Sequence, residues 1–140
     1  MKILLAVDGS EISTRAVKHV IALNKALSKP LKVVLANVDE PLLQRVAVTM
    51  GAQAVERYHA ENAEAMCRDA RRMLKRAGIV FEEEIHVGDV PDTLLKIARK
   101  RHVDQIVMGS HGSGPFRGMF LGSVSAKVIS NTTVPVTIVR

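Results

Sequence analysis

The sequence predicts a single α/β domain built around a parallel sheet. Five short apolar runs alternate with longer stretches whose apolar residues have helical spacing, which is the pattern of consecutive strand–helix units. The chain has 140 residues, a length typical of one domain. Hydrophobic residues make up 47% of it, enough to cover both faces of a sheet. We therefore expect residues 1–140 to form one domain.

The first strand is expected at Lys2–Val7, a mostly apolar run that Asp8-Gly9-Ser10 ends. A helix follows, because apolar residues then recur three and four positions apart, at Ala16, Val17, Val20, Ile21 and Leu27. The second strand is the apolar run Leu31–Val38. Pro41 opens a less regular stretch up to about Thr49, which is predicted to be a loop.

A long helix is predicted next, ending at Gly78, since glycine commonly follows the last helical turn. The residues that recur along it at helical spacing, three to four positions apart, are Val55, Tyr58, Met66, Ala70, Met73, Leu74 and Ala77. Cys67 is the only cysteine, so it excludes an internal disulfide, and we expect it to pack inside this helix.

Apolar and polar residues alternate along the third predicted strand, Ile79–Val87. We expect Ile79, Phe81, Ile85 and Val87 to face the core, and Glu82, Glu84 and His86 to face solvent. Asp89 can cap the next helix, which carries Pro91 in its first turn and ends near Arg101. Gln105–Met108 and Val134–Val139 are the last two strands, separated by a glycine-rich segment and a helix.

The strand order can be inferred from polarity. Continuously apolar strands belong inside a parallel sheet, whereas the half-polar third strand and the last strand, which carries Pro135, belong at its edges. This predicts the open order 3-2-1-4-5 with helices on both faces, a Rossmann-like arrangement. A flavodoxin-like order would put the apolar second strand at an edge. In the predicted order the topology reverses between strands one and four, and ligands of such sheets bind at the carboxyl ends of those strands.

The segment Gly109–Ser123 lies at that reversal and holds five glycines in fifteen residues. Glycine permits positive φ and lets backbone N–H groups approach a ligand closely, so successive amides can surround phosphate oxygens. The amino end of the following helix adds further donors, and the hydroxyls of Ser123 and Ser125 can contribute. The alternative is a flexible surface loop with Ser123 as an ordinary N-cap.

Three residues at neighbouring strand ends complete the candidate site. Asp8 can accept hydrogen bonds from a ribose or help to hold Mg²⁺ that bridges phosphates, or it can simply cap the helix that follows. Val38 can offer its backbone to an adenine edge, or it can be a core residue. Met108 ends the fourth strand beside them.

These residues resemble the universal stress proteins, in the branch that binds ATP, over the whole chain. That branch has the pattern Gly, two residues, Gly, nine residues, then Gly with Ser or Thr, which Gly109, Gly112, Gly122 and Ser123 match without a gap. The first strand through Ser10 and the segment Val134–Val139 are also similar to the family. The resemblance implies that Asp8 contacts ribose or metal and Val38 the adenine. It further implies that Gly109 and Gly112, with Gly122, Ser123 and Val124, hold the phosphates.

The chain departs from the family at two positions. Ser113 stands where members often have arginine, so one phosphate cation is missing, and Arg117 could replace it. Gly118 stands where a helix former is more common. These departures affect affinity rather than the backbone amides.

Catalysis is not indicated. The chain contains no Gly-x-x-x-x-Gly-Lys-[Ser/Thr] string, and its first loop lacks the Ser-Gly-Gly-x-Asp-Ser pattern of ATP-pyrophosphatase ligases. Ser110 and His111 are adjacent in an extended segment, so their side chains are expected to point apart, and the other four histidines are expected at the surface. We expect an ATP-binding regulatory protein. The alternatives are a true ATPase or phosphotransferase that uses Mg²⁺ bound by Asp8, and a scaffold with an empty site.

The charge and the chain ends suggest partners. The net charge is +6, with basic clusters at Arg68–Arg76 and Lys96–Arg101 that we interpret as solvated helix faces, and the scarcity of aromatic residues makes nucleic acid an improbable partner. No run is long enough to span a membrane and the first residues lack the layout of a secretory signal, so a cytoplasmic location is expected. The apolar edge strand Val134–Val139 predicts an antiparallel homodimer, as the resemblance also implies.

Overall fold

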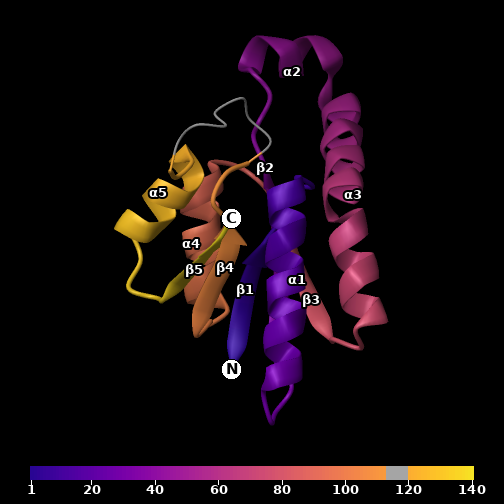
Figure 1. Ribbon diagram of the computed structural model, residues 1–140. Coiled ribbons are helices and arrows are strands. Elements are labelled where there is room, and N and C mark those ends of the chain that lie inside the picture. The colour runs from indigo at the N-terminus through magenta and orange to yellow at the C-terminus, as the bar shows by residue number, and fades with distance from the viewer. Residues whose placement is uncertain (113–119) are drawn as a thin grey trace.

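One parallel sheet, in the order β3-β2-β1-β4-β5, organises the residues that this computed structural model describes, 1–112 and 120–140 (Figure 1). Its strands are β1 (Lys2–Ala6), β2 (Lys32–Asp39), β3 (Phe81–Val87), β4 (Gln105–Gly109) and β5 (Val136–Val139). The predicted order 3-2-1-4-5 is thus confirmed, with β3 and β5 at the edges and the three continuously apolar strands between them.

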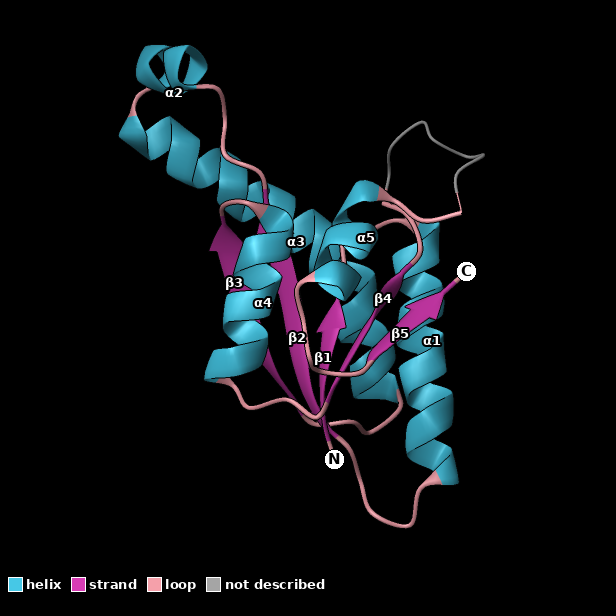
Figure 2. Ribbon diagram, turned by 90° about the vertical axis from the view of Figure 1, so that its left-hand side faces the viewer, coloured by secondary structure: helices cyan, strands magenta, loops and turns pink. Residues whose placement is uncertain are grey.

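Helices cover both faces of the sheet (Figure 2). The helices α1 (Glu11–Ala26) and α3 (Ala52–Arg76) pack on one face, and α4 (Val90–Lys100) and α5 (Ser123–Ser130) on the other. Each face has its own core: Ile3 and Leu5 of β1 point toward α1 and α3, while Leu4 and Ala6 point toward α4 and α5. The alternation of side chains along a buried strand therefore serves two cores at once.

The helix starts follow the sequence signals. The Ser10 side chain accepts a hydrogen bond from the Ser13 amide at the start of α1, and Asp89 accepts one from the Asp92 amide at the start of α4. Pro91 lies in the first turn of α4, where its missing N–H costs nothing. The capping residues Ser10 and Asp89 thus set the positions at which α1 and α4 begin.

Cys67 lies in α3 and is fully buried between the helix and the sheet, as expected. Burial raises the pKa of its thiol to about 11. The thiol is therefore neutral at physiological pH and behaves as a small apolar side chain.

The expected loop after Pro41 contains a further helix, α2 (Gln44–Met50), so the loop prediction was wrong there. None of its seven residues is buried, and Leu43 and Val48 are largely exposed. The helix projects with the start of α3 beyond the carboxyl edge of the sheet (Figure 1). Because it packs on no core, the usual apolar stripe of a surface helix is missing from its sequence.

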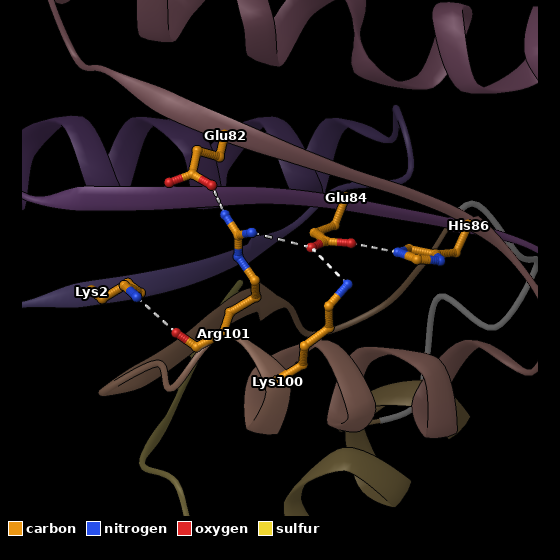
Figure 3. Close-up of polar contacts among 6 residues, drawn as sticks. All are labelled: Lys2, Glu82, Glu84, His86, Lys100 and Arg101. Atoms are coloured by element: carbon orange, nitrogen blue, oxygen red, sulfur yellow. Dashed lines mark hydrogen bonds and ion pairs between the residues drawn. The ribbon is translucent and has the colours of Figure 1, made fainter.

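The polar face of β3 is only partly exposed, since Glu82 faces solvent as predicted but Glu84 does not. Glu84 is buried, at 8% exposure, whereas Ile85 and Val87 are 40% and 48% exposed. The face that carries Glu84 lies under α4 (Figure 3), where the glutamate approaches His86 at 2.6 Å, Arg101 at 3.6 Å and Lys100 at 3.8 Å. Arg101 also pairs with Glu82. The prediction failed because a carboxylate surrounded by cations can be buried in place of an apolar side chain.

The basic clusters are only partly solvated faces. Arg71 of α3 forms ion pairs with Glu64 and with Glu83 of β3, which raises the pKa of its guanidinium above the usual value. Arg101 pairs with Glu82 and approaches Glu84 on the other face of β3. Arg71 and Arg101, one from each cluster, therefore attach α3 and the end of α4 to the edge strand β3. Most of the other basic residues in the two clusters are exposed.

Candidate functional site

A hollow lies where the carboxyl ends of β1, β2 and β4 meet the first turns of α4 and α5, at the predicted reversal of topology. Its volume of about 90 Å³ is below the roughly 300–1,000 Å³ of ordinary small-molecule pockets, so only one end of a ligand fits inside. Seven of the nine predicted site residues line it, namely Asp8, Val38, Met108, Gly109, Gly112, Val124 and Ser125. The other two, Gly122 and Ser123, lie at the start of α5 beside it.

The glycines of the site are required because neighbouring atoms lie close to them, and not because their backbone is left-handed. Positive φ among described glycines occurs at Gly9, Gly51 and Gly78, and not at Gly109, Gly112 or Gly122. A Cβ on Gly112 would lie 3.0 Å from an Asp8 carboxylate oxygen, and one on Gly122 would lie 3.2 Å from the Ser110 carbonyl oxygen. The glycines thus keep this opening clear of side chains.

The amino end of α5 differs from those of α1 and α4. Its N-cap is Gly122, so the alternative of Ser123 as the cap was wrong, and no side chain in the described part of the chain caps it. The first amides of a helix have no partner within the helix, and they carry the positive end of its dipole. An uncapped helix start beside an open hollow can bind an anion.

Asp8 is only partly committed to its own loop. One carboxylate oxygen accepts a hydrogen bond from the Ser10 amide at 2.9 Å, while Ser10 itself caps α1. The second oxygen is the one that faces Gly112. Asp8 can therefore position the first loop while its second oxygen faces the opening.

Ser110 joins several parts of the site and was missed by the sequence interpretation. Its carbonyl oxygen accepts hydrogen bonds from the Gly122 amide at 2.7 Å and from the Ser125 hydroxyl at 3.1 Å. Its hydroxyl lies 2.8 Å from Nδ1 of His111, so the expectation that these side chains point apart was wrong. Because Ser110 is 1% exposed, it stabilises the wall and is out of reach as a nucleophile.

Ser125 is placed differently from the expectation that its hydroxyl would donate to a ligand. The hydroxyl, on a residue that is 2% exposed, donates to the carbonyl oxygens of Gly109 and Ser110. It therefore fastens α5 to the end of β4. The remaining wall is mostly apolar and includes Ala36 of the predicted second strand, with Val90 and Leu94 of the helix predicted after Asp89. Only the strand order could have assigned them to a site.

His59 also lies elsewhere than predicted. Its side chain is 11% exposed, and Nδ1 lies 2.7 Å from the Asp39 carboxylate, which also accepts from Asn62 at 2.9 Å. The cluster joins α3 to the end of β2 on the face opposite the hollow. It is a packing contact of the sheet rather than part of the candidate site.

Two further predictions concern metal and membrane. Among residues 1–112 and 120–140, no three His, Cys, Asp or Glu side chains are grouped to hold a metal ion. None of the helices that the structure describes is long and apolar enough to span a bilayer. The proposed phosphate cation Arg117, and the departures at Ser113 and Gly118, lie outside the described residues.

Comparisons with known proteins find relatives that are similar in both sequence and fold. Universal stress protein MJ0577 of Methanocaldococcus jannaschii is 30% identical over 153 residues, covering 99% of this chain and 94% of that protein. The solved structure of MJ0577 has a TM-score of 0.85, at 31% identity, with 99% and 94% of the two chains covered.

A universal stress protein solved in complex with cAMP superposes with a TM-score of 0.67 at 28% identity, covering 100% of this chain and 96% of that one. The family description "Universal stress protein family" matches residues 1–140. The sheet order, the glycine-lined opening and these similarities lead to one conclusion: the chain belongs to the universal stress protein family.

Proposed function

We propose that this protein binds an adenine nucleotide, with ATP and Mg²⁺ as the physiological form, and acts as a regulatory protein of the stress response. The observation that carries the proposal is the uncapped start of α5 beside the opening that Gly112 and Gly122 keep clear. An apolar hollow with anion donors at its mouth suits a molecule with a flat apolar end and a charged tail. The relative solved with cAMP, itself an adenine nucleotide, supports this choice.

In this proposal the base enters the hollow and the phosphates remain outside it. Val38, Met108 and Val124 line the hollow and give the base apolar contacts. The phosphates then lie over Gly109, Gly112 and Gly122, and accept hydrogen bonds from the first amides of α5, with the exposed Ser123 hydroxyl as a further donor. Ser125 holds the cradle together instead of touching the ligand.

Magnesium would be held mainly by the phosphates, since oxygen ligands from one or two carboxylates and a nucleotide are its usual set. The Asp8 oxygen beside Gly112 is the carboxylate placed to share it or to accept from the ribose. The bound ion would neutralise phosphate charge. Asp8 orients the nucleotide in either role.

The proposed role is regulatory because the parts of the site bind rather than react. The hydroxyl of Ser110 is buried, and that of Ser125 is engaged with two carbonyl groups. Binding of nucleotide would change the surface at the carboxyl edge of the sheet, which partners recognise. We place this activity in the cytoplasm, where ATP is present.

Isothermal titration calorimetry with Mg-ATP, AMP and cAMP on the purified chain tests the proposal. Gly112→Val should weaken ATP binding at least about tenfold, because the branched side chain fills the opening. The control Ala60→Val adds similar bulk at an exposed position of α3 and should leave binding unchanged. Absence of heat with all three nucleotides would overturn the proposal. Phosphate release faster than about one per second would favour an ATPase instead.

We also propose that two copies pair through β5. Its four residues are all half-buried although they lie at an edge of the sheet, and three of them are aliphatic. An exposed apolar edge strand invites pairing, and an antiparallel twin strand satisfies it symmetrically.

A further inference from the structure

The edge of the sheet where the strands begin, here called the amino edge, carries a cluster of exposed basic residues. It comprises Met1 and the connections α1–β2, α3–β3 and α4–β4, which all lie at the end of the molecule away from α2 (Figure 1). The candidate nucleotide site lies at the opposite edge. A function of the amino edge would therefore be separate from the proposed nucleotide binding.

Main-chain contacts bring these connections side by side. The Lys32 amide donates to the Met1 carbonyl oxygen at 3.1 Å, and the Asp104 amide donates to that of Lys2 at 2.8 Å. Val33 pairs with Phe81, which puts Lys32 beside Val80. Met1, Lys32 and Val80 thus lie at or just before the first residues of three neighbouring strands.

The cations at this edge are exposed and outnumber the acids. Seven exposed basic residues lie there: Lys25, Lys29, Lys32, Lys75, Arg76, Arg99 and Lys100. The sequence from Ile12 to Val38 contains no acidic residue. Of the nearby acids, Asp104 accepts from the Lys2 amide, Glu82 pairs with Arg101, and Glu84 lies 3.8 Å from Lys100. These acids are fewer than the cations, so a positive field remains at this edge.

Stabilisation of helix ends does not account for the whole cluster. Lys25, Lys75 and Arg99 lie in last turns, where a cation favourably meets the negative end of the helix dipole. Lys29 and Lys32 lie beyond α1, in the connection and at the first position of β2. These two lysines have no helix end to stabilise.

Exposed apolar side chains stand among the cations. Val80 is 83% exposed, Met1 51% and Leu27 39%, and each comes from a different segment of the amino edge. A nucleic-acid backbone would be bound by the charges alone. A lipid interface uses both components, since cations meet anionic headgroups while apolar tips enter the boundary of the acyl chains.

We propose that the amino edge is a docking surface for an anionic lipid bilayer, on which the protein lies peripherally and reversibly. The sheet then stands on the membrane with its nucleotide site facing away. Each lysine or arginine near an anionic leaflet strengthens binding about fivefold, so several weak contacts suffice. The attraction falls within about a Debye length and is therefore sensitive to salt.

Vesicle co-sedimentation tests this proposal, with phosphatidylcholine alone and with added phosphatidylglycerol, at about 0.1 M and about 0.5 M salt. Wild type should bind only the anionic vesicles, and only at the lower salt. Lys29→Glu with Lys75→Glu should weaken binding at least about 25-fold, from two contacts of about fivefold each. Both lysines are exposed, so the fold is retained.

The matched control reverses the same number of charges at the other end. Arg45→Glu with Arg57→Glu changes exposed arginines of α2 and α3 and should alter vesicle binding by less than about threefold. Val80→Ser keeps the charge and should weaken vesicle binding severalfold. Gly112→Val should bind vesicles like wild type, whether or not the chain binds nucleotide.

Three results would overturn the proposal. The first is no binding to anionic vesicles at the lower salt. The second is an equal loss from the two double variants, which would mean attraction by net charge alone. The third is tighter binding of a fluorescent DNA duplex, measured by anisotropy in the same buffer, with Val80→Ser unchanged on both probes. That result would assign the surface to nucleic acid.

Discussion

Gly109 shows how one residue can serve packing and ligand access together. A Cβ at this position would lie 2.7 Å from Cγ2 of Ile12 at the start of α1 and 3.3 Å from the His111 carbonyl oxygen. The glycine thus lets the start of α1 approach the end of β4, beside the opening that Gly109 lines. Glycines in nucleotide sites are commonly explained by the approach of the ligand. Here the close contact with Ile12 of α1 by itself requires a glycine at position 109.

Gly109→Ala is expected to destabilise the fold by about 1–3 kcal/mol, because the added methyl meets a branched side chain with little freedom to move. Urea unfolding would measure the loss. The double variant with Ile12→Ala should recover part of it, since the clashing methyl is then absent. An Ile12→Ala background in which Gly109→Ala costs as much as before would contradict this explanation.

Ser110 and Ser125 show the limits of residue-level prediction. The sequence identified the glycines and Asp8 because their types and spacing suit a phosphate cradle. It could not show that the Ser125 hydroxyl faces two carbonyl groups, or that the hydroxyl of Ser110 meets His111. Those contacts depend on how α5 returns to the end of β4, which spacing along the chain does not encode.

At the scale of elements, β3 is held by charge on both of its faces. Arg71 of α3 binds Glu83 on one face, and Arg101 and Lys100 approach Glu84 on the other. The edge strand therefore combines a polar sequence with firm attachment to its covering helices. Charged side chains also disfavour addition of another strand at this edge.

Glu84→Gln is expected to lower the free energy of unfolding by about 1–3 kcal/mol, because the change removes the charge of a buried carboxylate that Arg101 and Lys100 approach. Glu82→Gln is the matched control: its side chain is 70% exposed, so its pair with Arg101 should contribute less than about 1 kcal/mol. Chemical denaturation of both variants gives the comparison. A larger loss at Glu82 than at Glu84 would refute the assignment.

The elements differ in how well the sequence predicted them, for physical reasons. The apolar strands identified the interior of the sheet, since a parallel sheet covered on both sides needs them, and the order followed. For β3, alternation gave the period but not which face is buried, because the cations that accompany Glu84 come from α4. Helix α2 has no core to face and so lacks the pattern that would reveal it.

At the scale of the whole molecule, β5 is the strand through which we propose that two copies pair. Hydrogen bonds from Ile106 to Pro135 and from Ser110 to Val139 show that the odd-numbered positions face β4. In a parallel ladder the intervening residues, Val136 and Ile138, direct their main-chain groups to the open edge. The proposed twin strand would pair with those groups.

Ile138→Pro should give a monomer with its fold retained, because proline removes a donor only on the open edge. Thr137→Pro should instead disrupt the ladder with β4 and destabilise the domain. Ile138→Ala controls for the lost side chain and should remain a dimer. Sedimentation velocity at micromolar concentration distinguishes these states, and a wild-type monomer would rule out the proposed pairing.

The burial of Cys67 has a practical consequence for spectroscopy. Its thiol is the only one in the chain, it is fully covered, and its raised pKa keeps it protonated at neutral pH. A maleimide dye will therefore not react with this thiol in the native protein. A single cysteine introduced at exposed Val48 can carry a fluorophore without first removing the natural one, and α2 becomes an attachment point for distance measurements.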